Sequence, residues 1–142
     1  MKTFAAKAMG CTAFVALAAT AGAASAQDSF SGDTIKIGIL NDMASGYSDT
    51  VGEGLFQTVK WAVEDFGGKV KGHPVEVLNA DTQLKADIAS TTARRWIDED
   101  KVDVLVAGSG SPIALAAMEV GKEKGAAVLN TGGPRFGPSR QV

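Results

Sequence analysis

Two serine hydroxyls, Ser109 and Ser111, follow a strongly apolar stretch in the second half of the chain. The local sequence, GSGSP, places small residues before a helical pattern. Pro112 suits the first helical position, and Ser111 suits the capping position before it. Free backbone N–H groups and the positive end of a helix dipole attract anions. These residue types predict a site for a carboxylate or a phosphate, and the alternative is an ordinary turn before a capped helix.

A strand, this loop, a helix and a second strand form one predicted βαβ unit over residues 102–131. Val102–Ala107 is a nearly continuous apolar run, which is typical of a strand buried on both faces. The helix has apolar residues at helical spacing, two lysines in its last turn and Gly125 as its stop. Ala127–Asn130 is predicted as the strand that follows.

Two similar strand and helix pairs precede this unit. The strands are predicted at Thr34–Leu40 and Val75–Asn79, and the helices carry apolar stripes over residues 55–66 and 88–98. Lys69–His73 is predicted as a basic turn. The regular alternation predicts an α/β fold with a parallel sheet, right-handed crossovers and helices on both faces.

The carboxyl ends of parallel strands meet at one edge of a sheet, so the loops that follow them are expected to lie together. Tyr47 lies in the long loop Asn41–Gly54. Two interpretations of Tyr47 stand: a wall against a ligand's side chain, or a surface aromatic packed on its own loop. Asp81, at the end of the second strand, is predicted to have a structural role in its loop, and the alternative is a place near the site. Trp61 lies off the centre of its helical stripe and is predicted to pack at a helix edge.

The first 26 residues have the features of an export signal. Lys2 and Lys7 precede an alanine-rich apolar segment, and ASA at 24–26 matches the pattern before a cleavage point, with Gln27 as the new terminus. The segment is too short and too weakly apolar for a comfortable membrane span. We therefore expect an exported, periplasmic protein whose mature part, residues 27–142, is one domain.

The composition of the mature part excludes several classes of function. It retains 12 basic and 16 acidic side chains, because the leader contributes only two lysines to the totals of 14 and 16. A net charge near −4 argues against nucleic acid as the main partner. Cys11 is the one cysteine of the chain and lies in the leader, and His73 is the one histidine. Neither a metal site nor a cofactor is expected.

Enzymatic signatures in this sequence are incomplete. Gly108-Ser109-Gly110 resembles the opening of a dinucleotide fingerprint, but Ile113 replaces the third glycine and the loop follows the third strand. No G-x-S-x-G elbow is present, and the only histidine lies at a turn, so a Ser-His-Asp hydrolase lacks its parts. A non-enzymatic binding protein fits better. A single-domain α/β enzyme remains the alternative of a different class.

Three stretches together resemble the amino-terminal lobe of the periplasmic substrate-binding proteins of ABC transporters for branched-chain and related amino acids. They are IKIGILNDMASGYSDTVGEG, AVEDFGG and SPIALAAMEVGKEKGAAVLNTG, and the resemblance spans residues 34–132. It implies the type I periplasmic-binding-protein fold, a small-molecule ligand (an amino acid or a related carboxylate) and a membrane permease as partner. A ligand-sensing or regulatory receptor domain of the same fold is the alternative function.

The same resemblance implies roles for five residues. Ser111, with Ser109 beside it, and backbone N–H groups would hold the carboxylate of the ligand. A carbonyl and a hydroxyl near Thr131 and Gly132 would hold its ammonium group, and Tyr47 would line the side-chain pocket. The residues directly after Gly132 depart from the family's pattern at the ammonium position.

Family members continue through a hinge into a second lobe of similar size, whereas this sequence stops at Val142. The resemblance therefore implies a partial amino-terminal lobe, as a truncated or frame-shifted gene product or a fragment of a longer protein. We expect weak or undetectable binding of free amino acids, because each charge-assisted hydrogen bond left unmade forfeits about 1.5–3 kcal/mol. An exposed apolar strand edge is also expected.

Overall fold

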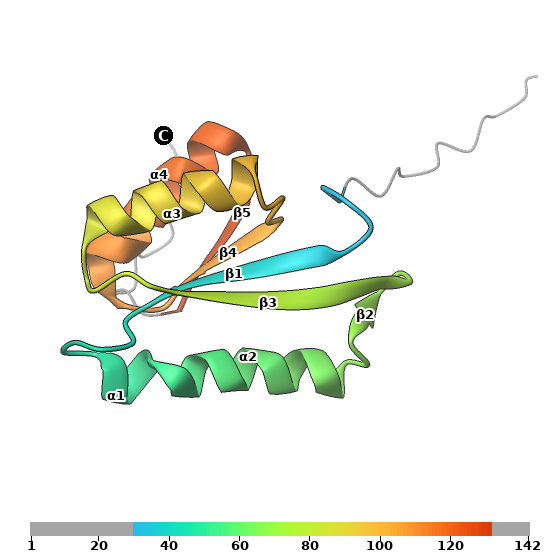
Figure 1. The fold of residues 1–142 in the computed structure, drawn as a ribbon, viewed down its shortest axis with the longest axis horizontal. Coiled ribbons are helices and arrows are strands. Elements are labelled where there is room, and N and C mark those ends of the chain that lie inside the picture. The colour runs from blue at the N-terminus through green and yellow to red at the C-terminus, as the bar shows by residue number, and fades with distance from the viewer. Residues whose placement is uncertain (1–29, 132–142) are drawn as a thin grey trace, which may run out of the picture.

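The computed structural model describes residues 30–131, so the predicted leader at 1–26 and the predicted site residue Gly132 lie outside the described residues. Five strands form one sheet in the order β2-β3-β1-β4-β5 (Figure 1). In chain order the elements are β1 Ile35–Asn41, α1 Ser48–Val51, α2 Glu53–Asp65, β2 Lys69–Val70, β3 His73–Asp81, α3 Ala86–Asp98, β4 Val104–Ala107, α4 Gly110–Lys124 and β5 Ala127–Asn130.

The predicted parallel sheet is confirmed. Strand β1 pairs in parallel with β3 on one side and with β4 on the other, and β4 pairs in parallel with β5. The prediction of a basic turn at Lys69–His73 is wrong at its ends, because β2 pairs antiparallel with the start of β3. Lys71 and Gly72 form the connection with φ angles of 51° and 91°, and positive φ at both central residues is the geometry of a tight hairpin.

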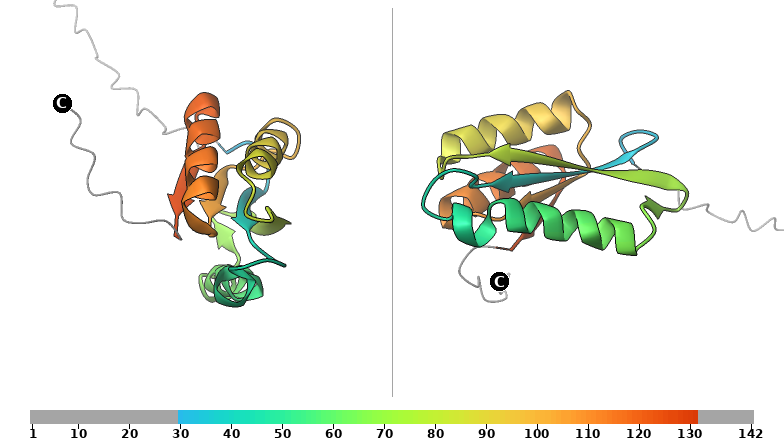
Figure 2. Two further views of the ribbon diagram at one scale, coloured as in Figure 1. Left: turned by 90° about the vertical axis from the view of Figure 1, so that its left-hand side faces the viewer. Right: turned by 60° about the horizontal axis from the view of Figure 1, so that its bottom comes forward.

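The helices form a layer on each face of the sheet. Helices α3 and α4 cover one face, and α1 and α2 lie along the other (Figures 1 and 2). The main core lies under α3 and α4, where Leu40 and Leu105 of the sheet meet Trp96 of α3 and Ile113 of α4. Gly38 makes this packing possible, since a Cβ atom there would lie 2.5 Å from Cε3 of Trp96.

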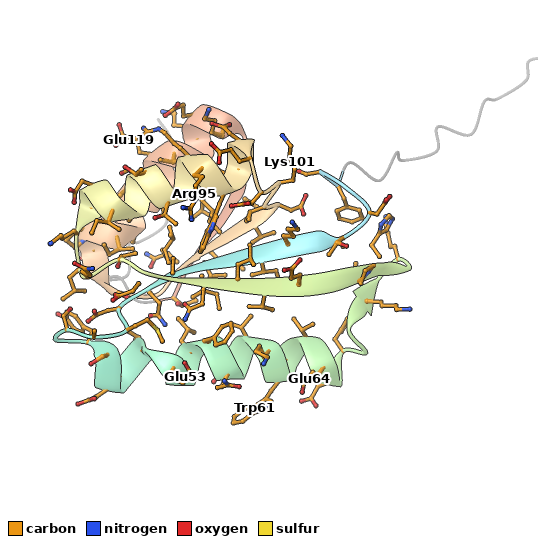
Figure 3. The ribbon with its side chains drawn as sticks, viewed as in Figure 1. Glu53, Trp61, Glu64, Arg95, Lys101 and Glu119 are labelled. Carbon is orange, nitrogen blue, oxygen red and sulfur yellow. The ribbon has the colours of Figure 1, made fainter. Side chains whose placement is uncertain are left out.

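Helix α2 packs less tightly. None of its residues is fully buried, and an apolar hollow of about 340 Å³ separates it from the sheet. The predicted edge packing of Trp61 is wrong, because this side chain is 61% exposed and points away from the sheet (Figure 3). Phe66, placed on the apolar stripe by its spacing, is 73% exposed just after the last turn. None of the helices between residues 30 and 131 has the length and apolarity that a membrane span requires.

The start of α4 differs from the sequence prediction. The helix begins at Gly110, so Ser109 occupies the capping position, while Ser111 and Pro112 lie inside the first turn. Gly110 has a φ of 78°, which glycine adopts at little cost and which lets the chain turn into the helix one residue after Ser109. The predicted end is confirmed: Gly125 takes a left-handed conformation directly after Lys124.

Candidate functional site

The carboxyl ends of β1, β3, β4 and β5 lie at one edge of the sheet because the four strands are parallel (Figure 2). We call this the carboxyl edge, meaning the loops that begin at Asp42, Thr82, Gly108 and Thr131. Three predicted site residues, Tyr47, Ser109 and Thr131, fall in these loops, and a fourth, Ser111, lies in the first turn of α4 directly after the loop that follows β4. The predicted convergence of the loops is therefore confirmed, while the contacts of each side chain with a ligand stay predictions.

The loop that carries Tyr47 is folded around the carboxylate of Asp42. This carboxylate accepts hydrogen bonds from the backbone N–H of Tyr47 at 2.7 Å and from the hydroxyl and N–H of Ser45 at 2.6 and 3.1 Å. Asp42 has no exposed surface, whereas the Tyr47 side chain is 50% exposed. Asp42 thus fixes the backbone of the loop and leaves the ring of Tyr47 at the surface.

Asp42 keeps its charge within this loop. Burial raises its pKa through desolvation, but hydrogen bonds from the Ser45 hydroxyl and from the N–H groups of Tyr47 and Ser45 together hold the pKa of Asp42 below its usual value. The negative charge is therefore matched by donors of the loop itself. A ligand's carboxylate has to find its donors elsewhere on the carboxyl edge.

The end of β3 ties a second loop to the first. One carboxylate oxygen of Asp81 accepts hydrogen bonds from the N–H of Met43 at 3.1 Å and of Gln83 at 2.9 Å. The N–H and the hydroxyl of Thr82 both donate to the carbonyl of Asn41, at 2.7 and 2.8 Å. The structural role predicted for Asp81 is confirmed by these contacts, which join the loops after β1 and β3.

The start of α4 carries the anion-attracting features of the edge. The side chain of Ser109 accepts no capping hydrogen bond from the first N–H groups of α4. The first turn of α4 also has no acidic residue, whereas the first turns of α1, α2 and α3 contain Asp49, Glu53 and Asp87. Of the described helix starts, this one is the best suited electrostatically to an anion.

The two serines at the start of α4 occupy different surroundings. Ser109 is only 1% exposed, and its hydroxyl donates to Oδ1 of Asn41 at 3.1 Å. Ser111 is partly exposed in the first turn of α4. Directly after β5, Thr131 is exposed; its N–H donates to the carbonyl of Ala107 at 3.0 Å and its hydroxyl to the same carbonyl at 3.4 Å. The surface of the edge thus presents Ser111, Thr131 and Tyr47, while Ser109 lies beneath it.

Sequence reasoning missed Asn41, Asp42 and Thr82, which hold the loops of the edge together. All three are fully buried polar residues at the ends of β1 and β3. The available signal was the Asn-Asp pair directly after an apolar strand, since such side chains form local hydrogen bonds with the backbone that follows. The prediction ended the strand at Leu40 and placed Asn41 in the loop, although Asn41 lies within β1, in register with Asp81.

Three hollows among the described residues lie away from this edge. Two, of about 290 and 340 Å³, lie beside α2, and the third, of about 300 Å³, is lined by Phe30 and Asp103 near the amino ends of the strands. None of these three is lined by Tyr47, Ser111 or Thr131. The predicted site residues Tyr47, Ser111 and Thr131 thus lie outside these three hollows.

Comparison with solved structures identifies the fold. A periplasmic binding protein from Burkholderia mallei is 45% identical, with a TM-score of 0.71 over 73% of this chain and 28% of its own. A branched chain amino acid ABC transporter periplasmic ligand-binding protein from Burkholderia xenovorans LB400 is 39% identical, with a TM-score of 0.67 over 70% of this chain and 26% of its own.

A more distant structure comes from Rhodopseudomonas palustris BisB5. It is the solute binding protein of an ABC transporter in complex with 3,4-dihydroxy benzoic acid, 25% identical, with a TM-score of 0.67 over 72% of this chain and 28% of its own. The chain thus spans a little over a quarter of the length of these three relatives. None of the curated proteins matches it.

The family assignment agrees with the architecture. The sheet and its helices match the type I periplasmic-binding-protein fold, and the family model described as "Periplasmic binding protein" matches residues 34–140. This match includes every described strand and helix as well as the loops of the carboxyl edge. The chain belongs to the periplasmic binding protein family.

Proposed function

We propose that this chain forms part of the solute-binding component of an ABC transporter and contacts a carboxylate-bearing solute at the carboxyl edge. The relative from B. xenovorans is described as serving a branched chain amino acid transporter, and the one from R. palustris holds 3,4-dihydroxy benzoic acid. Amino acids and this aromatic acid share one group, a carboxylate. A single anion-binding feature on the edge serves both kinds of ligand.

The start of α4 is the observation that carries the proposal. Its first turn has no acidic residue, the side chain of Ser109 does not cap it, and Ser111 adds a hydroxyl that is partly exposed. Backbone N–H groups and a positive dipole end at such a position favour a carboxylate. We assign carboxylate binding to Ser111 and to the N–H groups of this turn.

Tyr47 and Thr131 supply the remaining contacts in this proposal. The half-exposed ring of Tyr47 offers an apolar face to the side chain of an amino acid or to an aromatic ring. The hydroxyl of Thr131 donates to the carbonyl of Ala107, so its oxygen is proposed to accept from an ammonium group or a ring hydroxyl, and Gly132 is proposed to add its carbonyl. These contacts reach the ligand from one side only and leave part of its surface and hydrogen bonds to water, so we expect residues 27–142 tested by themselves to bind weakly.

Membership of the family supports a proposed location and a proposed partner. Residues 1–26 are proposed as a leader that directs the chain to the periplasm, where the carboxyl-edge surface meets its solute and a membrane permease receives it. Mass spectrometry of the secreted protein is expected to show Gln27 as the first residue. A protein that retains Met1 in the cytoplasmic fraction would contradict this location.

A ligand titration followed by amide NMR tests the function. L-leucine and 3,4-dihydroxybenzoate are each added to the chain up to tens of millimolar, and saturating shifts are expected at Gly110 and Ser111 with a Kd of about 1 mM or weaker, equivalent to about −4 kcal/mol. Ser111→Ala is expected to lose the response. Ser90→Ala, on α3, removes a serine hydroxyl away from the edge and is expected to keep it.

The proposal fails if neither acid shifts the signals of the carboxyl edge, or if both serine variants respond equally. A response confined to the hollow beside α2 would place the site elsewhere. Turnover of either compound would favour an enzyme, because the proposal assigns no reaction to the chain.

A further inference from the structure

The side chain of Ser109 is turned into the protein. As the residue before the first turn of α4 it holds the capping position, where serine ordinarily accepts a hydrogen bond from the helix. Instead its hydroxyl donates to Oδ1 of Asn41, and the residue is 1% exposed. The pair joins residues 68 positions apart in the sequence.

Asn41 connects the loop between β4 and α4 to two other loops. Its Nδ2 donates to the carbonyl of Gly52 at 2.6 Å, between α1 and α2, and its own carbonyl accepts both donors of Thr82. The side chain is completely buried, so water does not replace a missing partner. One asparagine thus joins the loops after β1, β3 and β4.

Gly108, directly before Ser109, also packs against the side chain of Asn41. A Cβ atom at Gly108 would lie 3.2 Å from Oδ1 of Asn41 and would overlap the side chain of Leu55 on α2. The N–H of Gly108 donates to the carbonyl of Leu40 at 3.1 Å. The loop that leads into α4 is therefore held on both its backbone and its side chain.

We propose that Asn41 and Ser109 are positioning residues that fix the start of α4, so that Ser111 alone of the two serines meets the solute. This inference rests on the proposed function for its ligand and revises the role that sequence resemblance gave to Ser109. Engaging Ser109 with Asn41 has two effects: it anchors the helix start, and it leaves the first N–H groups of α4 without a serine cap. Those groups remain available to a carboxylate.

Paired serine variants test the inference. Ser109→Ala removes the donor to Asn41 and leaves a buried acceptor without a partner, so amide hydrogen exchange at Gly108 is expected to rise about tenfold or more. Ser111→Ala removes a hydroxyl two residues later, and exchange at Gly108 is expected to stay within about twofold of wild type. Ser109→Thr, which keeps the hydroxyl, is expected to restore most of the protection.

Binding of 3,4-dihydroxybenzoate gives the second measurement. Ser109→Ala is expected to weaken binding severalfold with shifts still centred on the start of α4, whereas Ser111→Ala is expected to abolish the response. Equal exchange at Gly108 in the two alanine variants, or loss of binding in Ser109→Ala with exchange unchanged, would overturn the positioning role.

The two proposals fail in different ways. If wild-type protein shows no response to either acid, the proposed function fails, and the exchange comparison still decides whether Asn41 and Ser109 hold the helix start. Asn41→Ala provides an independent check: exchange is expected to rise at both Gly52 and Gly108. Asn79→Ala, an asparagine on the neighbouring strand β3, is the matched control and is expected to leave Gly108 unchanged.

Discussion

The carboxylate of Asp42 accepts a 2.7 Å hydrogen bond from the backbone N–H of Tyr47, five residues later, and the acid is fully buried while the tyrosine is half exposed. The buried charge therefore sets the path of the loop, and the loop sets the place of the ring. The position of Tyr47, a predicted ligand-contacting residue, therefore depends on a buried acid that the prediction did not include.

This relationship predicts acid sensitivity. The folded pKa of Asp42 is lower than its unfolded value of about 3.9, so the stability it contributes is complete above about pH 4 and is lost as the pH falls through the lower folded pKa. The urea concentration at the unfolding midpoint, measured between pH 7 and pH 2.5, is expected to decrease once the pH is below about 4. Asp42→Asn is expected to lower the urea midpoint at pH 7 and to make the midpoint depend less on pH below about pH 4.

Asp103 provides the internal comparison. Desolvation raises its pKa, but backbone hydrogen bonds from Lys36 and Ser31 lower it more, so its contribution has the same sign. Part of the acid sensitivity is therefore expected to persist in Asp42→Asn. If the urea midpoint of Asp42→Asn decreased below pH 4 as much as that of wild type, the role of Asp42 would be contradicted.

Gly38 provides a packing prediction. Its absent side chain accommodates Trp96, so Gly38→Ala forces the indole or the strand to shift and is expected to destabilise the protein by about 1–3 kcal/mol. Gly54→Ala is the control: nothing lies within 4 Å of a Cβ atom there, and alanine favours the helix α2. In urea unfolding, the midpoint of Gly38→Ala is expected to be lower than that of Gly54→Ala. Equal midpoints for the two variants would contradict this packing.

Strands and helices with a regular pattern of apolar residues could be predicted from the sequence because this pattern depends on neighbouring positions. The strand Ala127–Asn130 and the end of α4 at Lys124 agree with the prediction, and Ala89, Ala93 and Trp96 are buried on α3 as their spacing indicated. Each depends on side chains a few positions apart. The parallel sheet followed because the alternation of strands and helices leaves few other topologies.

The details of the site were not local and could not be predicted in the same way. Ser111 was predicted as the cap of α4 from its residue type and its place before Pro112. The helix instead begins at Gly110, and Ser109, in the cap position, is bonded to Asn41 of β1. Tyr47 was placed correctly at the carboxyl edge, yet its support by Asp42 needed the fold of the loop. The ligand contacts of Tyr47, Ser109, Ser111 and Thr131 stay predictions.

The two tryptophans are expected to differ in accessibility and in stability. Trp61 is 61% exposed and Trp96 only 4% exposed, so iodide is expected to quench the first and spare the second. Trp61→Phe is expected to remove most of the quenchable emission. Trp61→Ala is expected to change stability by no more than about 0.5 kcal/mol, and Trp96→Ala to cost about 3–5 kcal/mol. Similar quenching of both indoles would contradict this arrangement.

The last strand of the described sheet predicts self-association. Leu129 on β5 is 57% exposed, and Leu115 and Met118 on the neighbouring α4 are 53% and 43% exposed. An apolar edge strand is a template for pairing with another chain, and a lysine on such a strand opposes pairing. Leu129→Lys is therefore expected to lower light scattering at high protein concentration. Thr91→Lys adds the same charge on the exposed surface of α3 and is expected to have little effect, so equal solubilisation by both variants would assign the association to net charge and not to β5.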